Sequence, residues 1–358
     1  MNDILRPELV WIEGRCYRLN DATSEISTHV EQDLYENEIP FQDMQEDDDD
    51  NEFDVEMMDS GRYCTSLHVS KHYLGNIIGK KGAMRMRIQR DTNTDVKIPR
   101  IGENKDILIY GPSIANVKAA CRRINVIVMS ARRKQRATHF ISIPLNQPNI
   151  QKTFEKFKES VLRECQSRAL EESLFIPATK LHLTVGVMCL MDNEERLLVS
   201  KLLTEAKERI IMPIIQDHLP LRLRIKGLSY MNDDPKEINV LYSCVEEENA
   251  PAGLLQEMVD AIVDFFYKKG FMEKEFGRNN VKMHVTLLNT KYRGRREDDD
   301  DSMPRNRGTR QTFDGTDILN KFKDYDFGVV QLTDIHLSQR QTIGPDGYYQ
   351  PTCVINIS

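Results

Sequence analysis

The sequence predicts an α+β protein in which a small β-α-α-β-β-α domain precedes a larger domain of two α+β lobes. Three observations indicate this class. Short strands and helices alternate over residues 64–133 around a Gly-Lys-Lys-Gly turn. Two later strands read alike, KLHLTV at 180–185 and KMHVTL at 282–287, and each follows a strand and a helix. The 358 residues are 40% hydrophobic, which is sufficient for two cores of ordinary size.

Charge is distributed unevenly along the chain. Residues 1–60 contain 19 Asp and Glu and 3 Arg, a net charge of −16, whereas residues 61–137 contain 17 Lys and Arg and 4 Asp and Glu, a net charge of +13. The whole chain carries −7. A basic domain behind an acidic segment is typical of a nucleic-acid surface with an acidic competitor or spacer beside it.

Cysteine spacing and hydropathy exclude several classes of protein. The seven cysteines are scattered and form no Cys-x-x-Cys pair, which argues against a disulfide framework and a structural zinc site. No basic-then-apolar signal pattern begins the chain, and no apolar run approaches membrane length. We therefore expect an intracellular, soluble and reduced protein with no membrane partner.

Residues 1–61 are expected to form an N-terminal arm and an acidic, disordered linker. Residues 8–19 alternate around Glu13-Gly14 like a small hairpin and include the single tryptophan. A lone hairpin is marginal in water, so this one packs on the body, docks on a partner or stays loose. Residues 31–60 hold 14 acidic residues and no Lys or Arg, so they bury too little apolar surface to offset the entropy cost of ordering.

Residues 62–136 predict the first domain. Strands are expected at 65–70, 94–99 and 106–111. The first helix is indicated by apolar residues at helical spacing, namely Leu74, Ile77 and Ile78, and a basic helix follows the glycine turn. A long helix from about 113 to 133 has an apolar stripe of Ile114, Val117, Ala120, Cys121, Ile124 and Val128.

This stretch resembles a KH domain of the eukaryotic arrangement, on the residues Asn76-Ile77-Ile78-Gly79-Lys80-Lys81-Gly82, Ile88 and Ile98-Pro99. The resemblance implies single-stranded RNA or DNA as a partner, clamped through its backbone by the GxxG loop. Two glycines permit close approach to phosphate, the next helix N-terminus presents N–H groups, and the lysines add charge. The nucleic-acid-binding residues we predict are Gly79, Lys80, Lys81, Gly82, Arg85, Arg87 and Arg90.

Other interpretations of this region are weaker or stay open. A nucleotide P-loop over residues 75–81 is one residue too short, and Lys81 stands where that motif needs Ser or Thr. A glycine-punctuated helix-turn-helix with solvated lysines is the bland alternative. The basic run 132–136 is a helix-dipole cap, an RNA contact or a nuclear import signal.

Residues 137–358 predict the two lobes. Strands are expected at 138–143, 221–226, 238–245, 328–337 and 352–358, besides the two histidine strands. Helices are expected around 154–165, at 193–218 and at about 252–269, with apolar faces that include Leu162, Leu197 and Leu198. The order strand, helix, histidine strand recurs, which favours two lobes with their sheets facing a shared cleft.

Alternation within each histidine strand separates a polar face from a core face. His and Thr project from one face, together with the lysine two positions earlier. The opposite face is apolar in both strands, with Leu181, Leu183, Val185, Met283, Val285 and Leu287. Bringing the strands together would place two imidazoles and two hydroxyls around one polar cleft suited to phosphate chemistry.

His182-Leu183-Thr184-Val185 and His284-Val285-Thr286-Leu287 resemble the paired tetrapeptides of the 2H phosphoesterase (ligT-like) superfamily, whose fold has two such lobes. The resemblance implies a metal-independent phosphodiesterase without cofactor. One histidine would be general base and the other general acid, in an order that the sequence leaves open. Thr184 and Thr286 would hydrogen-bond the phosphoryl oxygens. The implied substrates are 2′,3′-cyclic phosphates, 2′–5′ linked oligonucleotides and RNA 3′ ends.

Several residues near these motifs have bland alternatives. A single His-x-Thr is usually structural, although two matching copies weaken that interpretation. Lys180 and Lys282 either raise the local potential or are merely solvated. His139 and His336 lack a following Thr and are interpreted as structural, and no further ligands stand close enough for zinc. Residues 293–311 form a flexible loop that covers the cleft or is only a solvated insertion.

The order of acidic arm, KH domain and 2H domain of the kinase-anchoring-protein type resembles a family of cointegrator-complex subunits, as do YMNDDP at 230–235 and Phe313-Asp314-Gly315. This resemblance implies a helicase and other complex subunits as partners, roles in transcription coactivation and alkylation repair, and localisation in the nucleus, with the cytoplasm as a second compartment. The alternative is a non-catalytic adaptor that binds RNA and complex partners and uses the cleft only for recognition.

Overall fold

The computed structural model describes residues 8–12, 15–19, 53–100, 103, 105–231, 233–274, 280–294 and 311–357. The chain forms two compact units, Met1–Glu52 and Phe53–Ser358. In the first unit, β1 (Glu8–Ile12) pairs antiparallel with β2 (Arg15–Leu19), which confirms the predicted hairpin. Residues 31–52 of the predicted linker lie outside the described residues, and the docking of the hairpin stays a prediction.

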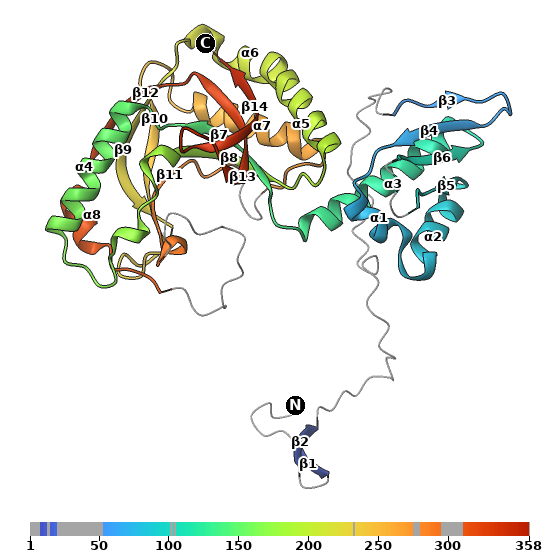
Figure 1. The fold of residues 1–358 in the computed structure, drawn as a ribbon, viewed down its shortest axis with the longest axis horizontal. Helices are drawn as coiled ribbons and strands as arrows, with labels where there is room; N and C mark the ends of the chain where they lie inside the picture. Colours follow the sequence, from blue (N-terminus) through green and yellow to red (C-terminus); the bar gives the residue numbers. More distant parts are fainter. Residues whose placement is uncertain are drawn as a thin grey trace. The chain divides into compact units, whose positions relative to one another are not determined.

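The second unit begins with a four-stranded antiparallel sheet and three helices (Figure 1). The sheet order is β3-β4-β6-β5, and α3 packs along β4 and β6. The elements in chain order are β3 (Glu56–Met57), β4 (Tyr63–Leu67), α1 (Lys71–Ile78), α2 (Ala83–Thr92), β5 (Asp95–Lys97), β6 (Ile107–Gly111) and α3 (Ile114–Arg133). From β4 onward this is the predicted β-α-α-β-β-α order. The edge strand β3 is an addition that the acidic sequence pattern does not reveal.

The apolar faces of this domain differ from prediction at two helix ends. On α3 the expected stripe is buried from Val117 to Val128, but Ile114 in the first turn is exposed. On α1 the buried residues are Tyr73 and Ile77, four positions apart on one face, whereas Ile78 points to solvent. The prediction placed Ile78 in the core because short helices give too few turns to define a face.

The larger domain is built on one antiparallel sheet of eight strands, with the order β12-β9-β10-β11-β8-β7-β13-β14. The two predicted lobes are the two four-stranded halves of this sheet, and they join where β8 pairs with β11. The strands are β7 (His139–Pro144), β8 (His182–Met188), β9 (Arg222–Tyr230), β10 (Val240–Glu247), β11 (Val285–Asn289), β12 (Asp326–Gln331), β13 (Asp334–Ile343) and β14 (Tyr349–Asn356).

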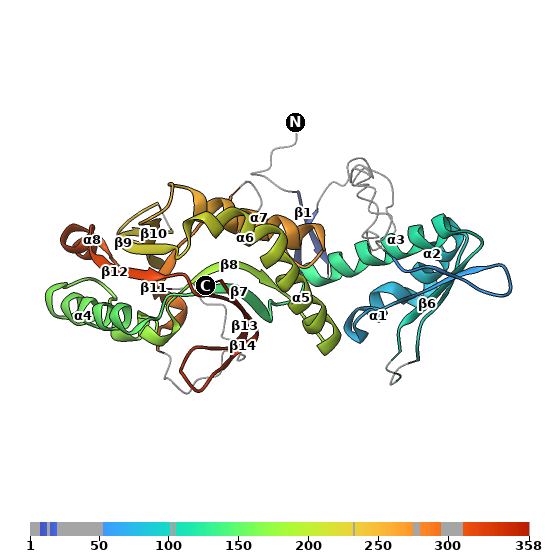
Figure 2. The same cartoon turned by 90° about the horizontal axis from the view of Figure 1, so that it is seen from above.

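Helices cover the apolar face of this sheet (Figure 2). Contacts place α4 on β12 and α8 on β9, in one half, while α5 contacts β14 and α7 contacts β8. Their bounds are α4 (Pro148–Glu164), α5 (Asn193–Ala206), α6 (Met212–Ile215), α7 (Leu254–Lys268) and α8 (Thr316–Phe322). Phe154 and Phe157 of α4 and Ile262 of α7 are fully buried in the shared core.

Two predicted elements are divided in the structure. The helix expected at 193–218 becomes α5, a π-helical turn at Lys207–Ile211 and α6, because Pro213 has no N–H to continue the ladder. The strand expected at 328–337 becomes β12 and β13. Leu197 and Leu198 are exposed, and so is Leu162. The core face of α5 is formed instead by Val199, Leu203 and Ala206.

The segments 230–235 and 313–315, which are far apart in sequence, meet beside this sheet. Phe313 is fully buried and forms an isolated bridge with Ile238. The Gly315 N–H donates to the Pro235 carbonyl at 2.9 Å. A Cβ at Gly315 would collide with the Ile238 side chain, so only glycine fits this crossing.

Candidate functional site

The two histidine strands are neighbours in the middle of the eight-stranded sheet. They run antiparallel, with Leu183 directly opposite Val285. Continuing this register by one residue in each direction sets His182 opposite Thr286 and Thr184 opposite His284. Facing side chains on such a pair are about 5 Å apart at Cβ. Each imidazole therefore lies beside the hydroxyl of the other motif, and the structure brings all four predicted residues together.

The opposite face of the strands confirms the predicted core. Leu181, Leu183 and Val185 are at most 2% exposed, as are Val285 and Leu287. Met283 is half-buried and packs against the same core. The four motif side chains are half-buried, as a site open to a substrate requires.

Both histidines are oriented in the same way by the backbone. Nδ1 of His182 donates to the Lys180 carbonyl at 2.6 Å, and Nδ1 of His284 donates to the Lys282 carbonyl at 2.7 Å. A carbonyl can only accept, so Nδ1 carries the proton and Nε2 is the basic nitrogen of the neutral ring. Proton transfer at either histidine therefore involves Nε2.

Aromatic rings surround His182 closely. Phe140 lies at 5.3 Å and Tyr349 at 5.4 Å between ring centroids, and Tyr348 at 6.3 Å. Burial among these rings lowers the pKa of His182 to about 4, and the nearby His284 acts in the same direction. The hydrogen bond to the Lys180 carbonyl opposes this shift. His182 is therefore neutral at pH 7, the state that a general base needs.

Two tyrosines that sequence reasoning missed complete the site. The Tyr242 ring packs edge-on against His284 at 5.5 Å, as Tyr349 does against His182. Tyr242 lies opposite Thr286 on the neighbouring strand β10. Its place in an alternating strand was the only sequence signal, and Tyr349 follows a hairpin that carries no motif.

Acid is expected to destabilise the fold through its buried histidines. Burial lowers the pKa of His139 to about 4, and Arg196 adds to the shift. Because an unfolded histidine has a pKa of about 6.5, the unfolded state binds more protons between pH 4 and 6.5, so stability falls as pH falls through that window. Urea denaturation from pH 4.5 to 7 should show this loss. His139→Gln should reduce the slope by up to about 1.4 kcal/mol per pH unit. Parallel curves for the two proteins would contradict the assignment.

The predicted GxxG loop has the backbone that its glycines suggest. Gly79 and Gly82 have φ of +68° and +82°, a region that glycine adopts without strain. A Cβ at Gly79 would lie 2.7 Å from the Met84 Cβ, so a side chain is excluded there. Gly82 caps the N-terminus of α2, and Lys80 and Lys81 are exposed between the two glycines.

The three predicted arginines of α2 are not equivalent. Arg85 lies in the first turn after the loop and is exposed, so it extends the positive surface of the two lysines. Arg87 and Arg90 both contact Asp91, at 3.8 Å and 3.0 Å. Arg123 of α3 contacts the same carboxylate at 3.0 Å. This carboxylate partly neutralises the later arginines, which leaves Arg85 as the strongest candidate for a phosphate contact.

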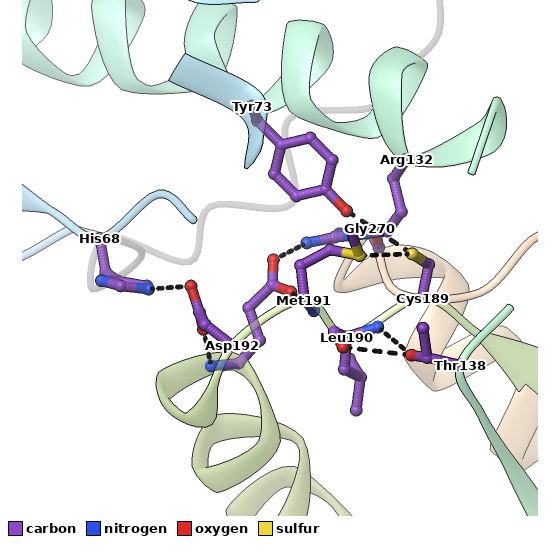
Figure 3. A network of polar contacts seen from close by, with 10 residues as sticks. His68, Tyr73, Arg132, Thr138, Cys189, Leu190, Met191, Asp192 and Gly270 are labelled. Atoms are coloured by element: carbon purple, nitrogen blue, oxygen red, sulfur yellow. Dashed lines mark hydrogen bonds and ion pairs between the residues drawn. The ribbon is translucent and has the colours of Figure 1, made fainter. Parts of the chain in front are cut away.

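Arg132 of the basic run 132–136 has a role that none of the three interpretations of that run foresaw. Its guanidinium donates to the Gly270 carbonyl and to Glu195, both at 2.6 Å (Figure 3). The side chains of Arg132 and Glu195 are only 12% and 6% exposed. The guanidinium also lies 4.6 Å from the Phe271 ring. Arg132 thus joins the end of α3 to the larger domain.

Further contacts accompany this ion pair. His68 bridges Asp106 and Asp192 at 3.0 Å and 3.2 Å, and the two carboxylates raise its pKa against the opposing and largest effect, burial. Tyr73 donates to the Cys189 sulfur at 3.8 Å (Figure 3). Asp192 also caps α5 by accepting from the Glu195 N–H at 2.9 Å. The two domains are therefore joined by a polar network as well as by the chain.

The ends of the predicted loop 293–311 are held by one arginine. Arg293 contacts Glu171 and donates to the carbonyls of Ala169 and Gln311, at 2.8 Å and 3.3 Å. Residues 295–310 lie outside the described residues, so covering of the cleft stays a prediction.

Metal and membrane features were searched over the same described ranges. There, no group of three or more His, Cys, Asp or Glu could hold a metal ion. No helix in that part of the chain is long and apolar enough to cross a membrane.

Known proteins match this chain over most of its length. Residues 137–357 match the family described as AKAP7 2'5' RNA ligase-like domain, and residues 65–126 match the KH domain family. The chain is 34% identical over 358 residues to activating signal cointegrator 1 complex subunit 1 of Mus musculus, covering 97% of each chain. The crystal structure of TT0787 of Thermus thermophilus covers 62% of this chain and 97% of its own, with a TM-score of 0.37 and 14% identity, too low to support an argument.

Proposed function

Because this chain belongs to the family of activating signal cointegrator 1 complex subunit 1 and contains a KH domain and an AKAP7 2'5' RNA ligase-like domain, we propose that it binds RNA and cleaves a phosphodiester bond in it. The observation that carries this proposal is the register of β8 and β11. It sets each motif histidine beside the threonine of the other motif.

The geometry supports a definite assignment of the two histidines. His182, neutral at pH 7, takes a proton from water or a ribose hydroxyl on Nε2 as that oxygen bonds to phosphorus. His284, in its protonated form, gives its Nε2 proton to the leaving oxygen as the old P–O bond breaks. Thr184 and Thr286 donate hydrogen bonds to the non-bridging oxygens, where negative charge accumulates in the transition state.

The substrate class follows from the KH domain and the matched family. A domain that holds single strands favours an RNA oligomer over a small cyclic nucleotide. The family description names 2'5' RNA, so 2′–5′ linkages are the first choice, followed by 2′,3′-cyclic phosphates and RNA 3′ ends. Turnover of such a panel, compared with a His182→Ala, His284→Ala double variant, tests the proposal.

The runner-up is a non-catalytic adaptor, which the relative's description as a complex subunit favours. In that case the polar face would recognise a phosphate without cleaving it. Both proposals include partners in a cointegrator complex, among them a helicase, and work in transcription coactivation and alkylation repair in the nucleus and secondarily the cytoplasm. Co-purification of tagged chain with such partners from nuclear extract would support this part, and recovery of the chain alone would contradict it.

Charge reversal of the GxxG lysines is expected to weaken single-strand binding at least about tenfold, because two phosphate contacts become repulsive. Lys80→Asp, Lys81→Asp should also flatten the dependence of affinity on salt, by about 0.7 per lost contact. Fluorescence anisotropy with a labelled RNA oligomer measures both quantities.

The matched control is Lys152→Asp, Lys156→Asp, which makes the same charge change on exposed positions of α4. Circular dichroism should show that both double variants remain folded. Equal affinity of the loop variant and the control would refute RNA binding by this loop.

A further inference from the structure

The polar face around the two histidines carries two matching groups of side chains. In one, Lys180 Nζ lies 5.8 Å from the Tyr349 ring centre, and that ring packs edge-on against His182. In the other, Lys282 Nζ lies 5.1 Å from the Tyr242 ring centre, and that ring packs against His284. Each half of the sheet thus supplies one Lys–Tyr–His group.

Each lysine serves its histidine through the backbone as well. The carbonyls of Lys180 and Lys282 hold Nδ1 of the histidines two residues later. The residue that orients each imidazole therefore also supplies an ammonium group, at a distance of about 6.6 Å along an extended backbone. This excludes the interpretation that these lysines are merely solvated at the start of a strand.

The antiparallel register places the two ammonium groups on opposite sides of the reacting centre. Lys180 precedes His182 on one strand and Lys282 precedes His284 on the other, so the lysines lie at opposite ends of the motif pair. A cation held over an aromatic ring is already positioned, so less conformational entropy is lost when it binds an anion. Two positioned cations beyond the reacting centre match a chain of phosphates that continues in both directions.

We propose that Lys180 and Lys282 are phosphate-binding subsites on either side of the reactive phosphate, and that the site takes an oligonucleotide with linkages on both sides of the reacting one. This inference rests on the proposed function, because it names the substrate length that the same site selects. A mononucleotide cyclic phosphate would leave both subsites empty, and a dinucleotide has no flanking phosphate to fill them.

The test compares binding of a 2′–5′ linked adenylate tetramer with that of the dimer, by competition against a fluorescent oligomer. It uses the full chain with Lys80→Asp, Lys81→Asp, so that the KH loop contributes little. Lys180→Gln and Lys282→Gln should each reduce the tetramer-to-dimer affinity ratio about tenfold, the value of one charge-assisted contact. Lys180→Arg should retain the ratio, because it keeps the cation and the stacking on Tyr349.

Lys156→Gln is the matched control, because it neutralises an exposed lysine of α4, on the helix that packs against the apolar side of the sheet. An unchanged ratio in both Gln variants would overturn the proposal. Equal losses of tetramer and dimer affinity would do so too, because they would indicate a general field instead of subsites. Binding is measured without turnover, so a chain that binds the tetramer selectively but cuts nothing would refute the proposed cleavage and leave the subsites standing.

Discussion

His182→Ala and His284→Ala are each expected to reduce kcat for a 2′–5′ linked oligonucleotide by about 10²- to 10⁴-fold, the contribution of a positioned acid or base. The double variant should lose about as much as the more damaging single variant, because the base and the acid act in one step. Single-turnover assays with the tetramer measure the loss. Its affinity should change much less, since the lysines and threonines remain.

His218→Ala is the control for this experiment, since His218 lies in the turn Gln216–His218 outside the sheet. Its kcat should stay within about twofold of the parent, as expected for a surface position away from the site. Turnover that survives in both motif variants would rule out the acid–base assignment. An absence of turnover in the parent protein, with retained phosphate-dependent binding, would favour the adaptor.

Arg132→Ala is expected to destabilise the chain by about 3–5 kcal/mol, the cost of leaving a buried charge without its partner. Glu195 would remain buried, the Gly270 carbonyl would lose a donor, and the stacking on Phe271 would disappear. Urea denaturation at pH 7 measures the change in the free energy of unfolding.

Arg133→Ala is a closely matched control for that variant. The neighbouring residue Arg133 pairs with Glu273 at 2.7 Å, but both side chains are about half exposed. Water screens such a pair, so this substitution should cost no more than about 1 kcal/mol. Equal costs for the two arginines would show that the Arg132 pair is screened as well.

A paired replacement separates the ion pair from its surroundings. Arg132→Met with Glu195→Gln removes both charges, while the new amide can still accept the hydrogen bond that the Met191 N–H donates to Glu195. Its cost should be well below that of Arg132→Ala, since no unpartnered charge remains. A larger loss in the paired variant would mean that packing on Phe271, and not charge, dominates.

Much of the fold could be predicted because its signals are local. The glycines at 79 and 82 specify a left-handed turn by themselves, and the alternation around His182 and His284 specifies which residues face the core. Local signals were weakest at Ile78, Leu197 and Leu198, where an apolar residue stands near a helix face without belonging to it. Helical periodicity over one or two turns cannot separate such residues from the core.

The sequence by itself determined the two domain types, the faces of the histidine strands and the side chains that could handle a phosphate. Only the tertiary structure decided that His182 faces Thr286, that Tyr242 and Tyr349 hold the two lysines, and that Arg132 is buried against Glu195. The physical reason is the same in each case. These partners lie between 40 and 170 residues apart, and pairings over such distances are set by strand register and core packing, which no local pattern encodes.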